Sequence, residues 1–169
     1  MILVAKVYRM KFSPDVSVKG FDNKHSKAYD DCRAEIFSKF IHYGIIGTGW
    51  ASVPLKAGMD EHEIKALPEY YSGTNQTFNN LCSICQGDYI WVVFSRKYYI
   101  FRVSMNSVGA EWEDDDLAKE KDWFIERDIG HYLYGEWREV GVGRDIVLDH
   151  DTRRSRIAEF LFHQIDRLL

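Results

Sequence analysis

Residues 87–104, GDYIWVVFSRKYYIFRVS, decide the fold. Two runs rich in β-branched and aromatic residues, Asp88–Ser95 and Lys97–Ser104, meet at Ser95-Arg96-Lys97 and predict an antiparallel hairpin. Both runs are apolar on both faces, and strands of this kind are usually covered on both sides, as in a small barrel flanked by helices. The stretch therefore predicts an α+β fold built on a small, twisted antiparallel β-barrel.

Helical periodicity surrounds the hairpin. Three helices are expected before it and a fourth after it, at 26–43, 60–67, 74–86 and 151–168. Ser26 and Gly44 are the expected N-cap and left-handed stop of the first helix. Asp60 with Glu63 is close to a capping box for the second. Both cysteines of the CSIC stretch at 82–85 fall on the apolar face of the third, where we expect them to be buried.

Further short strands are expected outside the hairpin. The predicted segments are 1–8, 45–50 (a short strand leading into a glycine-containing turn), 123–125, 137–140 and 146–148. The chain has no internal repeat, low-complexity tract or linker. Residues 1–169 are therefore predicted to form one domain.

The composition is that of an ordinary globular protein, with 46% hydrophobic and 28% charged residues. No stretch approaches the roughly 20 apolar residues that span a bilayer. The opening MILVAK has no basic region and no small-residue cleavage site, so we do not expect a signal peptide. Three cysteines are too few for a disulfide framework. These features predict a cytoplasmic protein with no membrane partner.

The negative charge is concentrated in one segment. The formal net charge is −4, yet residues 111–128 contain nine acidic and three basic residues, which leaves 19 basic against 17 acidic elsewhere. The rest of the chain is therefore mildly basic, and the net charge alone does not exclude a nucleic-acid partner.

No motif indicates catalysis or a bound metal. The CxxC at 82–85 lacks a second pair of ligands, and the acidic run at 111–116 lacks the glycine and the closing glutamate of an EF-hand loop. The six histidines are scattered, and none stands in a recognisable nucleophile motif. We therefore expect no catalytic residue, no metal and no cofactor.

Basic residues accompany the aromatic side chains of the hairpin. Residues 89–104 include Arg96, Lys97 and Arg102 and no acid. Aromatic faces beside guanidinium groups are what a protein uses to stack a base and hold its phosphate. Core packing accounts for at least half of these aromatic residues, so Trp50 and Trp112, on predicted loops, are the better candidates for ligand contact.

Three short motifs occur in a defined order. Ile45–Trp50 has the pattern IG-x-GW, Gly87–Val103 the pattern GD-hydrophobic-W followed by YY-x-x-R-V, and Tyr134–Val140 the pattern W-x-x-V. Together they resemble the motifs of PUA-like domains, in particular the EVE-like modules of modification-dependent restriction and phage-defence proteins. The resemblance covers about 45–148. It implies a small barrel with helices around it and recognition of a nucleic acid, often of one modified base taken out of the stack.

The resemblance also implies which residues contact the nucleic acid. The base pocket would be lined by Trp50, Ser52, Trp112 and Tyr98. The phosphates would be met by Arg96, Lys97, Arg102, Arg153, Arg154 and Arg156. Two features depart from the family pattern. Phe101 stands where a glycine usually precedes the Arg-Val pair, which would narrow a pocket, and the acidic segment at 111–128 would repel a duplex unless it faces away.

The sequence is therefore interpreted as a non-catalytic reader domain that binds nucleic acid, DNA rather than RNA, and works with an effector domain or subunit. Two other classes stay open. One is an RNA- or small-ligand-directed enzyme on a PUA-like scaffold, such as an ASCH-type hydrolase. The other is a protein-interaction module of a defence complex. Salt dependence separates them, because binding to phosphates weakens steeply as salt rises.

Overall fold

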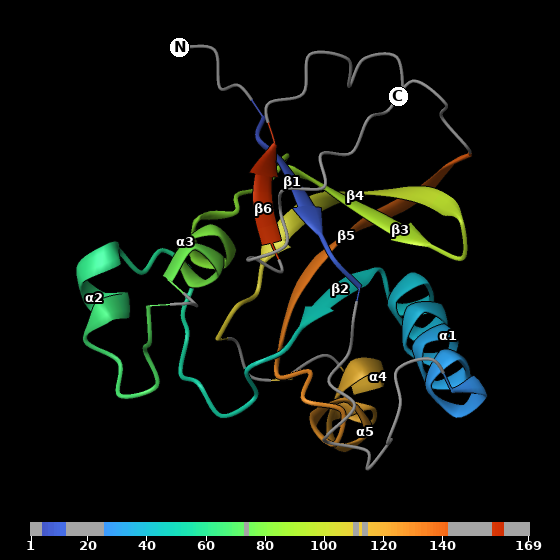
Figure 1. Ribbon diagram of the computed structural model, residues 1–169, viewed down its shortest axis with the longest axis horizontal. Coiled ribbons are helices and arrows are strands. Elements are labelled where there is room, and N and C mark those ends of the chain that lie inside the picture. Colours follow the sequence, from blue (N-terminus) through green and yellow to red (C-terminus); the bar gives the residue numbers. More distant parts are fainter. Residues whose placement is uncertain are drawn as a thin grey trace.

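The predicted hairpin lies at the centre of a curled, mixed β-sheet (Figure 1). The computed structural model describes residues 5–12, 26–72, 75–109, 112, 115–141 and 157–160. Within them, six strands are ordered β2-β5-β4-β3-β1-β6 across the sheet. The strands are β1 (Val7–Met10), β2 (Ile45–Thr48), β3 (Tyr89–Phe94), β4 (Lys97–Asn106), β5 (His131–Gly141) and β6 (Ile157–Phe160). The fold is α+β, as expected.

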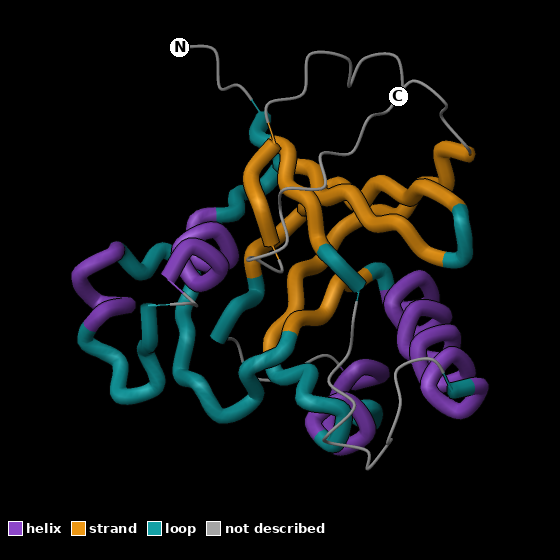
Figure 2. The backbone as a smooth tube through the Cα atoms, viewed as in Figure 1, coloured by secondary structure: helices purple, strands orange, loops and turns teal. Residues whose placement is uncertain are grey.

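Five helices occur in the described residues (Figure 2). They are α1 (Lys27–Tyr43), α2 (Glu61–Lys65), α3 (Asn75–Ser83), α4 (Asp115–Ala118) and α5 (Lys121–Ile125). The predicted caps of the first two are confirmed. Ser26 accepts a hydrogen bond from the backbone of Tyr29, Gly44 has φ +64°, and Asp60 forms a reciprocal capping box with Glu63.

The hairpin turn is tighter than predicted. Phe94 pairs directly with Lys97, so only Ser95 and Arg96 form the loop and Lys97 already belongs to β4. Both loop residues have positive φ, +49° and +64°, which matches the type I′ turn that the twist of a two-residue hairpin favours.

One strand pairing differs from the predicted antiparallel barrel. β1 runs parallel to β3, with Val7 opposite Tyr89. Parallel neighbours need a long crossover, and here it carries α1, β2, α2 and α3. The remaining pairings are antiparallel, so the sheet is mixed. β2 and β6 stand at its two ends, and no pairing between described residues joins them.

Three local predictions were wrong, two about secondary structure and one about the burial of Cys85. Residues 123–125 lie in helix α5, where Phe124 is buried, rather than in a strand. Residues 157–160 form strand β6 rather than part of a helix, because they pair with the otherwise open edge of β1. The N-cap expected at Thr74 and the strand expected at 146–148 lie outside the described residues.

The third error concerns Cys85, which is exposed, whereas Cys82 is buried as predicted. Helix α3 ends at Ser83, because the backbone N–H of Cys85 donates to the carboxylate of the buried Asp88, at 2.8 Å, and not to a helical carbonyl. The other oxygen of Asp88 accepts from the backbone N–H of Lys6 at 3.0 Å. Burial raises the pKa of the Cys82 thiol to about 11, so this side chain is an apolar core group.

The core lies between one face of the sheet and the helices. Aromatic side chains dominate it: Phe37 of α1 stacks on Phe94 of β3 at 4.5 Å and meets Trp137 of β5 edge-on at 5.2 Å. A smaller cluster of Val7, Trp91 and Ile100 is buried on the opposite face. The hairpin is therefore covered on both faces, as its sequence predicted.

Helix α1 is tied to the segment before α5 by an ion pair. Lys39 Nζ lies 2.8 Å from Glu120 Oε2, and Tyr43 donates its hydroxyl to Glu120 Oε1 at 3.2 Å. The hydrogen bond from Lys39 lowers the pKa of Glu120. A carboxylate with a lowered pKa contributes stability above its unfolded pKa of about 4.3, and this contribution is lost as the pH falls through the folded value.

We therefore expect Glu120→Gln to lower the free energy of unfolding at neutral pH by less than about 1 kcal/mol, since the pair is partly exposed. The difference from wild type should shrink as the pH falls through the folded pKa of Glu120, where its carboxyl becomes neutral like the amide of glutamine. Thermal melts across the acid range measure the effect. The same Glu120→Gln change in a Lys39→Met background is the matched control and should show a much smaller pH dependence, because the ion-pair partner is already absent. A deficit that persists at low pH would contradict the assignment to the ion pair.

A candidate ligand pocket at the end of strand β2

A cavity of about 300 Å³ lies where three loops meet beyond the end of β2. One wall is the chain from Ala51 to Lys56, which follows β2. The second is Gly109, in the turn after β4, and the third is Gly130 with His131, where β5 begins. The cavity therefore lies at one end of the sheet, at the first residues of β5.

Trp50 redirects the chain from β2 into the first wall. Its backbone has φ +60°, a left-handed conformation that is uncommon for a bulky residue. Its carbonyl accepts from the N–H of Val53 at 3.0 Å, and its half-buried indole meets Phe78 of α3 edge-on at 5.2 Å. The predicted glycine-containing turn is thus anchored to α3 by the tryptophan that follows it.

Direct backbone contact joins the first wall to the start of β5. Asp128 accepts from the N–H of Ala51 at 3.1 Å, and Gly130 donates to the carbonyl of Thr48 at 3.1 Å. A Cβ atom at Gly130 would lie 2.3 Å from Cα of Ala51. Only glycine permits this approach, so the two walls meet without side chains between them.

The turn after β4 packs on the other side of the same loop. Ala57 donates to the carbonyl of Val108 at 3.2 Å. Gly109 has φ +78°, and a Cβ atom there would lie 2.4 Å from the carbonyl oxygen of Leu55. The turn after β4 therefore holds the loop after β2 in place.

His131 connects two of these walls. It is 7% exposed, its Nε2 lies 2.9 Å from the carbonyl oxygen of Val53, and its Nδ1 accepts from the N–H of Gly109 at 3.3 Å. Burial lowers the pKa of this imidazole, although hydrogen bonds to the Val53 and Trp50 backbones and the charge of Asp128 act in the opposite direction.

The residues proposed for the base pocket are distributed over three places. Ser52 is exposed and lines the cavity, and Trp50 stands two residues before it. Trp112 is only 8% exposed and stacks on Phe124 at 5.5 Å, so it is a core side chain and not an exposed lid. Tyr98 lies at the hairpin, where its ring meets Trp91 edge-on at 6.2 Å.

The proposed phosphate contacts do not surround the cavity. Tyr98 pairs with Gly141 at the far end of β5, and this 11-residue strand covers roughly 33 Å at about 3.3 Å per residue. Arg96 and Lys97 at the hairpin turn are therefore remote from His131. Residues Arg153, Arg154 and Arg156 lie outside the described part of the chain.

The basic residues of the hairpin also face different ways. Lys97 and Arg102 are five residues apart in a regularly paired stretch of β4, so they lie on opposite faces of the sheet. Lys97 forms an ion pair with Glu139 at 3.2 Å, whereas Arg102 borders a separate depression with Tyr89 and Glu136. The hairpin does not present one continuous basic surface.

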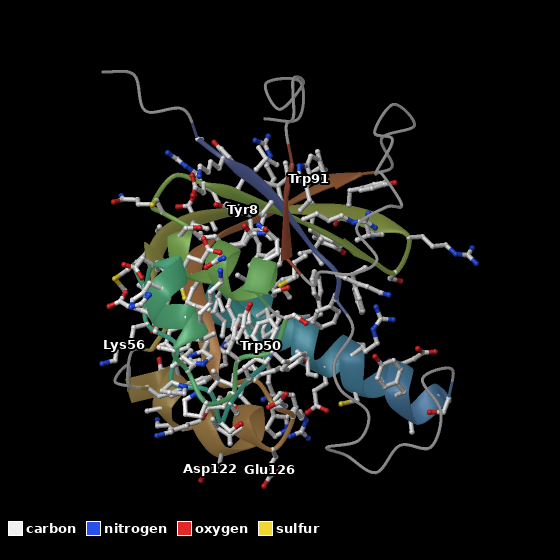
Figure 3. The ribbon with its side chains drawn as sticks, turned by 60° about the vertical axis from the view of Figure 1, so that its left-hand side comes forward. Tyr8, Trp50, Lys56, Trp91, Asp122 and Glu126 are labelled. Atoms are coloured by element: carbon white, nitrogen blue, oxygen red, sulfur yellow. The ribbon has the colours of Figure 1, made fainter. Side chains whose placement is uncertain are left out.

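Lys56 and His131 also line the cavity, although the sequence did not predict them as site residues. Figure 3 shows Lys56 projecting from the surface, with Trp50 further inside. The histidine looked like one of several scattered ones, because its position depends on the pairing of Thr48 with His131 between β2 and β5. The only local signal is that a glycine, Gly130, immediately precedes it.

The acidic segment adjoins the cavity through its last residue. The carboxylate of Asp128 is engaged by the N–H of Ala51. Asp122 and Glu126, in α5 and just after it, are exposed and point outward at the edge of the molecule, away from Trp50 (Figure 3). The charges of α5 therefore lie beside the cavity without lining it.

The chain matches no protein-family model, no curated protein and no solved structure. Among the helices of the described residues, none is long and apolar enough to cross a membrane. The same residues contain no group of three or more His, Cys, Asp or Glu side chains placed to hold a metal ion. The geometry of the cavity is therefore the main evidence about function.

Proposed function

We propose that the protein is a non-catalytic, PUA-like/EVE-like reader domain that receives one base, extruded from DNA, in the cavity beside Ser52. The observation that carries this proposal is the position of the cavity. It opens directly after the Ile45–Trp50 motif, at the segment for which the family resemblance implies a base pocket. The proposal includes a cytoplasmic setting and an effector domain or subunit in a restriction or phage-defence system.

The size and lining of the cavity support a single small, flat ligand. Ligand pockets commonly enclose about 300–1,000 Å³, so this cavity is at the small end of that range. Extruding a base costs a few kcal/mol, and stacking on an aromatic ring returns about 1–3 kcal/mol. Trp50 directly precedes the first wall but packs on Phe78 and does not line the cavity, so its indole would have to turn towards the base to contribute this stacking.

Lys56 is the cation that lines the cavity, and it would meet a phosphate next to the extruded base. Arg96 and Lys97, at the hairpin turn, are too remote to contact the same nucleotide. Lys56→Ala should remove one phosphate contact. We therefore expect it to reduce the slope of log affinity against log salt concentration by about 1. Arg96→Ala should leave this slope unchanged for a short duplex centred on the cavity.

The proposal predicts that a bulky side chain in the cavity weakens DNA binding. Fluorescence anisotropy at low salt would compare duplexes containing cytosine, 5-methylcytosine and 5-hydroxymethylcytosine. We expect Ser52→Phe to weaken binding of the preferred duplex by at least about tenfold, since its ring occupies the space of the base. Arg96→Ala is the matched surface control. Absence of binding to all three duplexes, or full binding by Ser52→Phe, would refute the proposal.

A binder of small free ligands is the second candidate. The observation that favours it is that Lys56 is the single cation among the lining residues. Such a site suits an uncharged nucleoside better than a phosphate backbone. Binding of a free nucleoside that is insensitive to salt, without binding of duplex DNA, would identify this class.

A further inference from the structure

The hydrogen bonds of His131 define its protonation state. Nδ1 lies 3.3 Å from the N–H of Gly109, which is a donor, so this ring nitrogen must carry a lone pair. Nε2 lies 2.9 Å from the carbonyl oxygen of Val53, which is an acceptor, so this nitrogen must carry the proton. The arrangement is satisfied only by a neutral imidazole protonated at Nε2.

The two partners of the ring belong to different walls of the cavity. Val53 is in the loop after β2, and Gly109 is in the turn after β4. The ring lines the cavity and spans the two walls. Its length therefore sets the separation between Val53 and Gly109.

We infer that neutral His131 is the positioning residue that holds the two walls of the cavity at their ligand-binding separation, and that protonation of Nδ1 releases the wall formed by Gly109. A protonated Nδ1 places one donor against another, so the hydrogen bond from Gly109 is lost. The bond from Nε2 to Val53 persists and leaves one wall attached. The cavity is therefore closed at neutral pH and loosened in acid.

The charged groups around the ring fit this behaviour. Asp128, on the turn before β5, acts on the imidazole through its charge, and its carboxylate also holds Ala51 in the adjoining wall. Lys56 lines the same cavity from the loop after β2. Burial outweighs the attraction of Asp128 and lowers the pKa of His131, so the neutral, closed form is favoured at neutral pH. Stability from this group is present above its unfolded pKa, about 6.5, and is lost as the pH falls.

Nuclear magnetic resonance tests the inference without a ligand. In the ¹⁵N-labelled protein, the ring nitrogen shifts of His131 should identify the Nε2–H tautomer at about pH 8. During acidification the amide shift of Gly109 should change with the same midpoint as the ring, and its hydrogen exchange should accelerate. The amide of Gly135, which donates to Gly44 further along β5, is the internal control and should not follow this midpoint. The inference is overturned if the chemical shift of the Gly109 amide does not change with the titration of His131.

Two variants extend the test to binding, and this arm rests on the proposed function. Acidification through the titration of His131 should weaken binding of the preferred duplex to wild type by about 5- to 150-fold, the usual range of coupling between sites. His131→Gln, which donates to a carbonyl but does not titrate, should bind with an affinity that no longer depends on pH through this range. His131→Leu should bind weakly at every pH. His62→Gln, on the exposed surface of α2, should keep the wild-type profile.

The two arms separate the possible failures. If no duplex binds at any pH while the Gly109 amide follows His131, the role of His131 is supported and the proposed function is refuted. If duplexes bind and His131→Gln retains the wild-type pH profile, the positioning role is refuted while the function stands.

Discussion

Replacing Trp112 by alanine should lower the free energy of unfolding by about 3–5 kcal/mol, the usual cost of removing a buried large aromatic side chain. The indole is 8% exposed, and its ring lies between Phe124, at 5.5 Å and 27°, and Tyr132, at 4.8 Å. Its loss removes one aromatic packing partner from each of these two neighbours. Urea denaturation at pH 7 measures the change.

Two control variants test whether Trp112 is a core side chain or a ligand contact. Trp112→Phe keeps a ring against Phe124 and should recover most of the lost stability, because the volume change is smaller. Tyr71→Ala removes an aromatic side chain that is 63% exposed and should change stability by no more than about 0.5 kcal/mol. If Trp112→Ala unfolded like wild type but no longer bound DNA, Trp112 would be a ligand contact, as the family resemblance implied, and not a core side chain.

The features predicted correctly from sequence have local determinants. The N-cap at Ser26, the left-handed stop at Gly44 and the capping box at Asp60 each depend on residues within one helical turn. The hairpin depends on two adjacent runs and a short turn. Each of these patterns is complete within a few residues, so no knowledge of the rest of the chain is needed.

The features missed depend on partners far away in sequence. Residues 157–160 have apolar positions spaced as on a helix, but they pair with the edge of β1, some 150 residues earlier. Residues 123–125 form an apolar run that suits a strand or a helical turn, and they pair with no strand of the described sheet. Tertiary pairing decided both cases, and a single sequence does not encode it locally.

The candidate site was predictable only in part. Of the two loop residues that the family resemblance implied, Ser52 lines the cavity, whereas Trp50 precedes the first wall and does not line it. His131 required knowledge that β2 pairs with β5. In contrast, the division of Lys97 and Arg102 between two faces follows from their odd spacing in one strand, so the sequence already argued against a single basic surface.

Gly135→Ala should destabilise the protein by at least about 3 kcal/mol, at the upper end of the usual cost of overpacking. A Cβ atom at this position in β5 would lie 2.1 Å from the carbonyl oxygen of Arg102 and 2.5 Å from the ring of Phe101. The neighbouring strand cannot move away, because it is paired on both sides. Glu136→Ala, one residue further and exposed, is the matched control and should cost no more than about 0.5 kcal/mol. Urea denaturation of both variants measures the difference.

The close approach of Gly135 to the ring of Phe101 explains a departure from the family pattern. Phe101 is fully buried, packs against Trp137 at 4.9 Å and does not line the cavity beside Ser52, so it fills the sheet core and does not narrow that cavity. The absence of a side chain at Gly135 makes room for its ring. A double-mutant cycle with Phe101→Leu isolates this coupling. If the ring is the main obstacle, Gly135→Ala should cost less in the Phe101→Leu background. If the carbonyl of Arg102 dominates, the two costs should add, because no change at Phe101 moves a backbone oxygen held in the sheet.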